Sequence, residues 1–205
     1  NDCHPDYVKY LLGKKTLAVK SINEIITKIP MKDKLSFNHS LVEKLYTEYQ
    51  NIEYNDEIEY QRLSNDLKGR KVLLLRPGSS IIEEQERIAG FISENIPVVF
   101  SINFLIDAYP IDYVFMGNSK RYSQFFHKIY GQCNGMKVIC TSNITESNKQ
   151  IDYLFNFNSL LNTPDSIRDN PLLMLLKILN KCKITDIVLA GFDGYTTQNT
   201  KNYYN

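Results

Sequence analysis

The feature that most constrains this fold is a short apolar run that turns into a loop and then into a helical pattern. In the segment 71–84 (KVLLLRPGSSIIEE), four consecutive apolar residues are followed within a few positions by a Pro-Gly pair, two serines and the start of a helical pattern. A strand that is apolar at every position is typical of a parallel sheet covered on both faces. The sequence therefore predicts an α/β fold, in which ligands bind where such strands end and helices begin.

Apolar runs and helical patterns alternate after this segment. Helical patterns cover residues 81–94, 120–130 and 171–181. The alternation predicts a Rossmann-like, mainly parallel sheet of roughly five or six strands with right-handed crossovers. The first strand is expected near the centre of the sheet, because it has no polar member. The predicted strands are 72–75, 98–102, 113–116, 137–141, 153–157 and 186–190.

Only helical patterns precede Lys71. An amphipathic stripe between residues 19 and 29 needs a partner, which we expect to be the α/β domain or a second copy of the chain. We therefore divide the chain into a helical linker or docking segment, residues 1–68, and a Rossmann-like α/β domain, residues 69–205. The chain begins at Asn1 without methionine and ends in a polar run just after a predicted strand. We expect it to be a piece of a longer protein, truncated at the C-terminus.

Charge and cysteine content narrow the functional class. The 24 basic and 23 acidic residues nearly cancel, so net charge gives no support to binding of nucleic acid or of an anionic membrane. The four cysteines are scattered without a CxxC pair, which argues against a zinc site or a disulfide framework and favours reduced thiols. No segment reads as a membrane span or a signal peptide. We expect a cytoplasmic protein without a metal site in this chain.

Small and polar residues follow each predicted strand. Because parallel strands deliver their carboxyl ends to one edge, we expect these residues to line one cleft. A glycine lets a backbone approach a ligand, and N–H groups at a helix start favour a phosphate. Asparagine and aspartate side chains suit the base and hydroxyls of a nucleotide or sugar. Ordinary turn chemistry is the alternative at any single position. The expected site residues are Gly78, Ser79, Ser80, Asn103, Asn118, Ser119, Ser142 and Asp193.

The loop after the first strand matches neither common phosphate-binding motif. It has one glycine, not the three of GxGxxG, and no Gly-Lys-Ser/Thr follows it. Glu83 and Glu84 suit a helix dipole without any ligand and would repel a nearby phosphate, so a plainly capped helix is an alternative. The three histidines have no partner at metal-ligand spacing, and no nucleophile–base pair can be assembled. Catalytic residues therefore stay unassigned.

The N-terminal segment resembles part of a known family. The stretches CHPDYVKYLL (3–12) and SINEII (21–26) are similar to the region after the catalytic barrel in bacterial proteins of the hydroxy-oxovalerate aldolase and HMG-CoA lyase superfamily. In that group a TIM barrel carries the divalent metal and the catalytic residues, and a tail of helices plus an α/β domain follows. The resemblance implies that this chain is the C-terminal part of an aldolase, a lyase, and that its partner is the barrel of the same polypeptide. No catalytic residue of the barrel carries over.

The α/β part is also similar, over fewer positions, to bacterial sialyltransferases of the lipooligosaccharide type. In that family the matching positions surround a cytidine nucleotide, so the resemblance implies binding of a nucleotide or nucleotide-sugar. Arg76 and Pro77 replace the family's Gly and Asn, and the catalytic histidine segment has no counterpart. Glycosyl transfer is therefore not implied. The matching positions are Gly78, Ser80, Glu83 or Glu84, Asn103, Asn118-Ser119 and Gly191-Phe-Asp193.

These observations give one functional hypothesis and two alternatives. We expect an accessory domain of an aldolase that binds a nucleotide or nucleotide-sugar-like ligand and is not catalytic alone. The alternatives are a glycosyltransferase-like domain that uses an activated sugar, and a non-catalytic assembly module that packs on the barrel. Binding of a nucleotide separates the first two from the third. Turnover of a nucleotide-sugar separates the glycosyltransferase from the accessory domain.

Overall fold

The computed structural model describes residues 40, 54–117, 121–122, 124–125, 129, 135–144, 151–162 and 170–193. The helices expected before residue 53, the site residues Asn118 and Ser119 and the polar run 196–205 lie outside the described residues.

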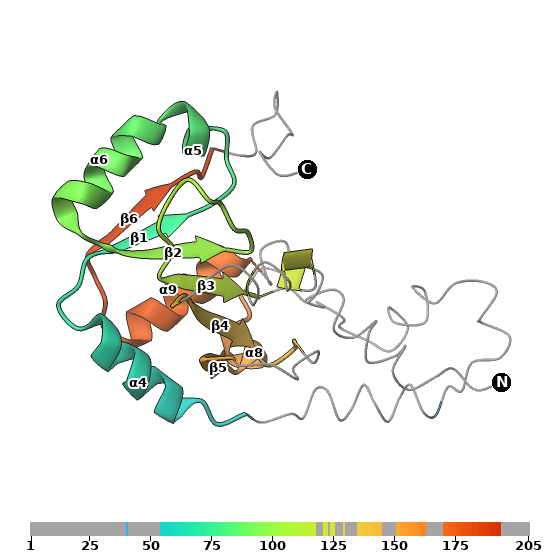
Figure 1. Cartoon of the computed structure of the whole chain (residues 1–205). Coiled ribbons are helices and arrows are strands. Elements are labelled where there is room, and N and C mark those ends of the chain that lie inside the picture. The colour runs from blue at the N-terminus through green and yellow to red at the C-terminus, as the bar shows by residue number, and fades with distance from the viewer. Residues whose placement is uncertain are drawn as a thin grey trace, which may run out of the picture.

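Six parallel strands form a single sheet (Figure 1). The order across the sheet is β5-β4-β3-β2-β1-β6, and every neighbouring pair is parallel. The predicted Rossmann-like α/β fold is thereby confirmed. The strands are β1 (Val72–Leu75), β2 (Val98–Ile102), β3 (Tyr113–Met116), β4 (Lys137–Thr141), β5 (Tyr153–Phe155) and β6 (Ile187–Ala190).

The sheet reverses its direction of growth beside β1. Strands β1 to β5 are added successively on one side, and β6 returns to the other side of β1. All four residues of β1 are buried, as predicted, and β1 pairs with a strand on each side. It lies next to the edge strand β6 and not at the middle of the sheet. The loops after β1 and β6 therefore leave from a topological switch point, where open α/β sheets bind ligands.

Local sequence explains where the helices begin and end. The side chain of Asn170 accepts hydrogen bonds from the backbone N–H groups of Leu172, at 3.0 Å, and Leu173, at 3.4 Å, and Pro171 occupies the first helical turn. The predicted helix 81–94 is broken at Glu84, whose φ of −109° interrupts the turn. The described helices are α4 (Glu57–Leu67), α5 (Ser80–Glu83), α6 (Gln85–Asn95), α8 (Phe157–Leu160) and α9 (Pro171–Lys181).

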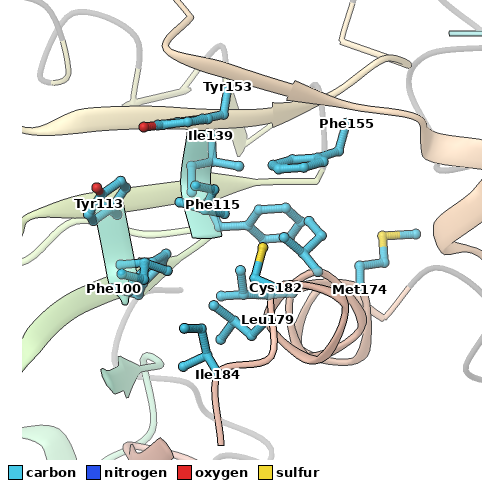
Figure 2. Packing of buried hydrophobic residues seen from close by; sticks show 14 of the residues in the cluster. Phe100, Tyr113, Phe115, Ile139, Tyr153, Phe155, Met174, Leu179, Cys182 and Ile184 are labelled. Atoms are coloured by element: carbon cyan, nitrogen blue, oxygen red, sulfur yellow. The ribbon is translucent and has the colours of Figure 1, made fainter. Parts of the chain in front are cut away.

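Helices cover both faces of the sheet. Alternate residues of each strand point to opposite faces. One face packs against α4, α8 and α9, and the other packs against α5, α6 and helical residues between 121 and 129. Figure 2 shows the first face, where Phe100, Tyr113 and Phe115 from the strands share one buried cluster with Met174 and Leu179 of α9. The rings of Phe100 and Tyr113 stack with centroids 4.7 Å apart.

Helix α4 shares the core of the sheet, although it precedes the expected domain boundary at residue 69. Tyr60, Leu63 and Leu67 are buried in the same cluster as the strands. The hydroxyl of Ser64 donates a 3.1 Å hydrogen bond to the carbonyl of Cys182, just after α9. The α/β unit therefore includes residues 57–67, and the division of the earlier residues stays a prediction. Among the described helices, none is long and apolar enough to cross a membrane.

Candidate functional site

The loops after β1 and β6 lie in direct backbone contact. The N–H of Gly78 donates to the carbonyl of Gly191 at 2.9 Å, and the N–H of Arg76 donates to the carbonyl of Ala190 at 3.0 Å. A methyl group on Gly78 would lie 2.5 Å from the Gly191 carbonyl oxygen and would overlap the carboxylate of Asp193. Gly191 has a φ of +76°, and a methyl group there would overlap the carbonyl of Arg76. Both glycines are therefore needed for the two loops to meet.

This contact changes the role expected for Gly78. The sequence suggested that its small size lets the backbone approach a ligand. The structure shows instead that Gly191 and Asp193 occupy the space where a side chain at position 78 would lie. A larger residue at position 78 must separate the two loops, so it would disturb the fold as well.

The carboxylate of Asp193 is fixed against the start of α5. One oxygen accepts hydrogen bonds from the Ser79 hydroxyl at 2.7 Å and from the Ser80 backbone N–H at 3.0 Å, and the other accepts from the Ser80 hydroxyl. Partial burial alone would raise the pKa of Asp193, but the bonds from Ser80 and Ser79 outweigh it and lower the pKa to about 2. Asp193 is therefore ionised at neutral pH and caps α5 from a distant part of the chain.

A groove of about 320 Å³ opens beside this carboxylate, between α6 and the edge strand β6. Ser80, Gly191 and Asp193 lie at its polar end, and Glu84 and Arg87 form an ion pair of 2.6 Å on its α6 side. Its remaining lining is mainly apolar. The apolar side chains are Leu73, Ile88, Phe91, Val188, Leu189, Ala190 and Phe192.

Two other predicted site residues connect neighbouring strands instead of lining the groove. Asn103 has a φ of +57°, and its side-chain oxygen accepts a 3.0 Å hydrogen bond from the N–H of Gly117 after β3. The hydroxyl of Ser142 accepts a 3.0 Å hydrogen bond from the N–H of Phe157 at the start of α8. Both residues sit at the carboxyl edge, as topology predicts, but their described contacts are structural.

The structure thus brings together Gly78, Ser79, Ser80 and Asp193, whereas Asn103 and Ser142 do not line the groove. Sequence reasoning missed the α6 wall of the groove. The signal was available in the spacing of Glu84, Ile88 and Phe91, because residues four and three apart share one face of a helix. The sequence did not show that β6 lies opposite that face of the helix.

A second polar cluster lies at the amino edge of the sheet, at the opposite end from the groove. The carboxylate of Asp66 accepts hydrogen bonds from Lys137 and from the hydroxyls of Tyr113 and Tyr153. These bonds, that of Lys137 foremost, lower the pKa of Asp66. Burial, with the carboxylate next, raises the pKa of both tyrosines. The cluster ties α4 to three strands, and all its groups are engaged with one another.

The described residues offer no metal centre and no activated thiol. No three His, Cys, Asp or Glu side chains among them gather closely enough to bind a metal ion. Cys140 and Cys182 are buried free thiols, and burial raises the pKa of both, that of Cys182 to about 11. A thiol with a raised pKa is a poor nucleophile at neutral pH.

Comparisons of this chain with protein-family models, with curated proteins and with solved structures gave no match. The geometry of the groove is therefore the basis for a proposal about function.

Proposed function

We propose that this chain is an accessory α/β domain of an aldolase-type protein and that it binds a nucleotide or nucleotide-sugar-like ligand in the groove between α6 and β6. The observation that carries the proposal is the carboxylate of Asp193, held by Ser79 and Ser80 at the polar end of that groove. In dinucleotide-binding α/β folds, an acidic side chain commonly accepts hydrogen bonds from ribose hydroxyls. Asp193 is preorganised for the same task.

The shape and lining of the groove support a small ligand. Its volume of about 320 Å³ lies at the lower end of the range of small-molecule pockets. Phe91 and Ile88 provide an apolar wall for a base or for the face of a sugar ring. The position beside the β1/β6 switch point is where open α/β sheets bind ligands.

The same groove favours binding over catalysis. Its described lining contains no histidine, cysteine or lysine. The Ser80 hydroxyl donates to a carboxylate whose pKa is about 2, and so weak a base does not activate a hydroxyl at neutral pH. The glycosyltransferase alternative requires a base from elsewhere, and turnover of a nucleotide-sugar would be its direct test.

A thermal-shift screen of nucleosides, nucleotides and nucleotide-sugars tests the proposal, because a ligand that binds the native state raises the apparent melting temperature. We expect at least one of these compounds to raise it for the wild type and to raise it less for Asp193→Asn. Asp186→Asn is the matched control, because Asp186 is exposed just before the amino end of β6 and does not line the groove. A screen in which no compound shifts the wild type would contradict the proposal.

One observation favours the assembly module as a second candidate. The side chain of Leu189 on the edge strand β6 is 48% exposed, and an exposed apolar edge strand is a site for pairing with another chain. Light scattering of the wild type and of Leu189→Lys would test this. A wild type that self-associates, together with a monomeric variant, would support assembly through β6.

A further inference from the structure

The polar end of the groove offers hydrogen-bond acceptors to a ligand, because the donors of Ser79 and Ser80 are already bonded to Asp193. The Ser79 and Ser80 hydroxyls each give their single proton to Asp193, and the Ser80 backbone N–H does the same. A hydroxyl that donates its proton keeps its oxygen lone pairs as acceptors. Among the described residues, backbone N–H groups donate to the carbonyl oxygens of Ser79 and Ser80, and none donates to their hydroxyl oxygens. A carboxylate has about four acceptor sites, and Ser79 and Ser80 fill three of them. A ligand in the groove therefore meets the remaining acceptor site of Asp193 and the hydroxyl oxygen of Ser80, both of which line it.

The charge at this end disfavours an anion. Asp193 and Glu84 are both acidic, and Arg87 is the only basic side chain among the described residues that line the groove. The Nη1 atom of Arg87 lies 2.6 Å from a carboxylate oxygen of Glu84, so its charge is already balanced. The formal charge of the described lining is therefore negative, so a phosphate near Asp193 would meet like charge. The hydroxyls of Ser79 and Ser80 already donate to Asp193 and are not available to it.

Backbone packing keeps the carboxylate in place. Gly78 leaves no room for a side chain between its backbone and Asp193, and the N–H of Gly78 is bonded to Gly191. For a phosphate to reach the start of α5, Asp193 would have to leave three hydrogen bonds from Ser79 and Ser80. The carboxylate already occupies the position that the sequence suggested for a phosphate.

We propose that the Asp193 end of the groove selects hydrogen-bond donors, namely the neighbouring hydroxyls of a ribose or other sugar ring, and rejects phosphate. This rests on the proposed function and assigns the part of the ligand that the site recognises. A nucleotide or nucleotide-sugar would place its sugar against Asp193, and its phosphates would lie outside this end of the groove.

Matched ligand pairs test the selection. The probes are adenosine, cytidine, guanosine and uridine, their 5′-monophosphates, their 2′,3′-dideoxy forms and inorganic phosphate, measured by calorimetry with the whole chain. We expect a ribonucleoside to bind about as tightly as its monophosphate and about tenfold or more tightly than its dideoxy form. Inorganic phosphate at millimolar concentration should not compete.

Variants of Asp193 and Ser80 test whether these residues cause the preference for ribonucleosides over dideoxynucleosides. In Asp193→Asn the ratio of ribonucleoside to dideoxynucleoside affinity should fall towards one, whereas Asp186→Asn should keep the wild-type ratio. Ser80→Ala removes one acceptor oxygen and leaves the Ser80 N–H bonded to Asp193, so it should weaken ribonucleoside binding. This variant tests the proposal if Asp193→Asn does not fold.

The possible failures are distinguishable. Two results would overturn the selection for hydroxyls and leave the proposed function standing. One is that inorganic phosphate displaces a bound nucleotide, and the other is that dideoxynucleosides bind as tightly as ribonucleosides. An absence of binding by every nucleoside, nucleotide and nucleotide-sugar would overturn both.

Discussion

The hydroxyl of Tyr109 donates a 2.6 Å hydrogen bond to the backbone carbonyl of Ile81, within the short helix α5. Tyr109 is buried in the loop after β2, and burial raises the pKa of its hydroxyl. This bond connects a segment beyond β2 to the helix that carries Ser80. The position of the Asp193 end of the groove therefore depends on a residue that does not line it.

Removal of this hydroxyl should destabilise the protein. Tyr109→Phe keeps the ring and leaves the Ile81 carbonyl without its donor in a buried place, which should cost about 1–2 kcal/mol of the free energy of unfolding. Urea unfolding of the two proteins measures the difference. A variant as stable as the wild type would mean that Ile81 finds another donor.

Two glycine substitutions should have opposite effects on stability. Gly78→Ala forces a methyl group against the Gly191 carbonyl and the Asp193 carboxylate, so it should destabilise the fold by about 1–3 kcal/mol, as overpacking does. Gly90 lies inside α6, where an added methyl group has nothing within 4 Å. Gly90→Ala should stabilise the protein by about 0.5–1 kcal/mol.

Urea unfolding of the two glycine variants side by side measures both effects. The comparison separates steric overlap from helix propensity, because the chemical change is identical. Equal stability of Gly78→Ala and the wild type would show that the β1 and β6 loops can separate without cost, and would weaken the argument that Asp193 is held in place.

Most of the sheet could be predicted from the sequence because its strands are apolar at nearly every position. The bounds predicted for β1, β2, β3 and β4 agree with the structure. The fifth strand was predicted to extend to Phe157 but ends at Phe155, because the side chain of Asn156 accepts a hydrogen bond from the N–H of Asn158 and starts α8. A capping residue inside an apolar run is a local signal that periodicity alone does not show.

The site was predictable only in part. Topology placed Ser80 and Asp193 at the same edge of the sheet, because parallel strands end together. Their mutual hydrogen bonds were not predictable, since they depend on β6 pairing with β1 and not with another strand. For the same reason the sequence could not show that an internal carboxylate takes the place expected for a phosphate.

Acid should destabilise the protein in a window set by Asp193 and Asp66. Hydrogen bonds lower the pKa of both carboxyls in the folded state, that of Asp193 to about 2. Such groups stabilise the native state above their unfolded pKa of about 3.9, and the contribution is lost as pH falls towards the folded pKa. The urea midpoint should therefore fall between about pH 4 and pH 2.

Asp193→Asn should reduce the fall in the urea midpoint over that window, and the double variant with Asp66→Asn should reduce it further. The two carboxyls sit at opposite edges of the sheet, so their effects should add. If Asp193→Asn loses stability as steeply as the wild type, the carboxylate does not hold its bonds to Ser79 and Ser80 in solution.

Relief of backbone strain at Ile96 should stabilise the protein. Ile96 ends α6 with a φ of +47°, and its side chain is 75% exposed. A β-branched residue is strained in this left-handed conformation, whereas glycine adopts it freely. Ile96→Gly should raise the free energy of unfolding by about 0.5–1 kcal/mol, since the relief of about 1–2 kcal/mol exceeds the entropy that glycine loses on folding.

The matched control for this substitution is Ile58→Gly, because Ile58 is also exposed, at 68%, but lies within α4. Glycine in a helix should lower the free energy of unfolding by about 0.5–1 kcal/mol. The melting temperature and the urea midpoint should therefore rise for Ile96→Gly and fall for Ile58→Gly. If both variants lose stability equally, the side chain of Ile96 makes stabilising contacts that outweigh the strain of its left-handed backbone.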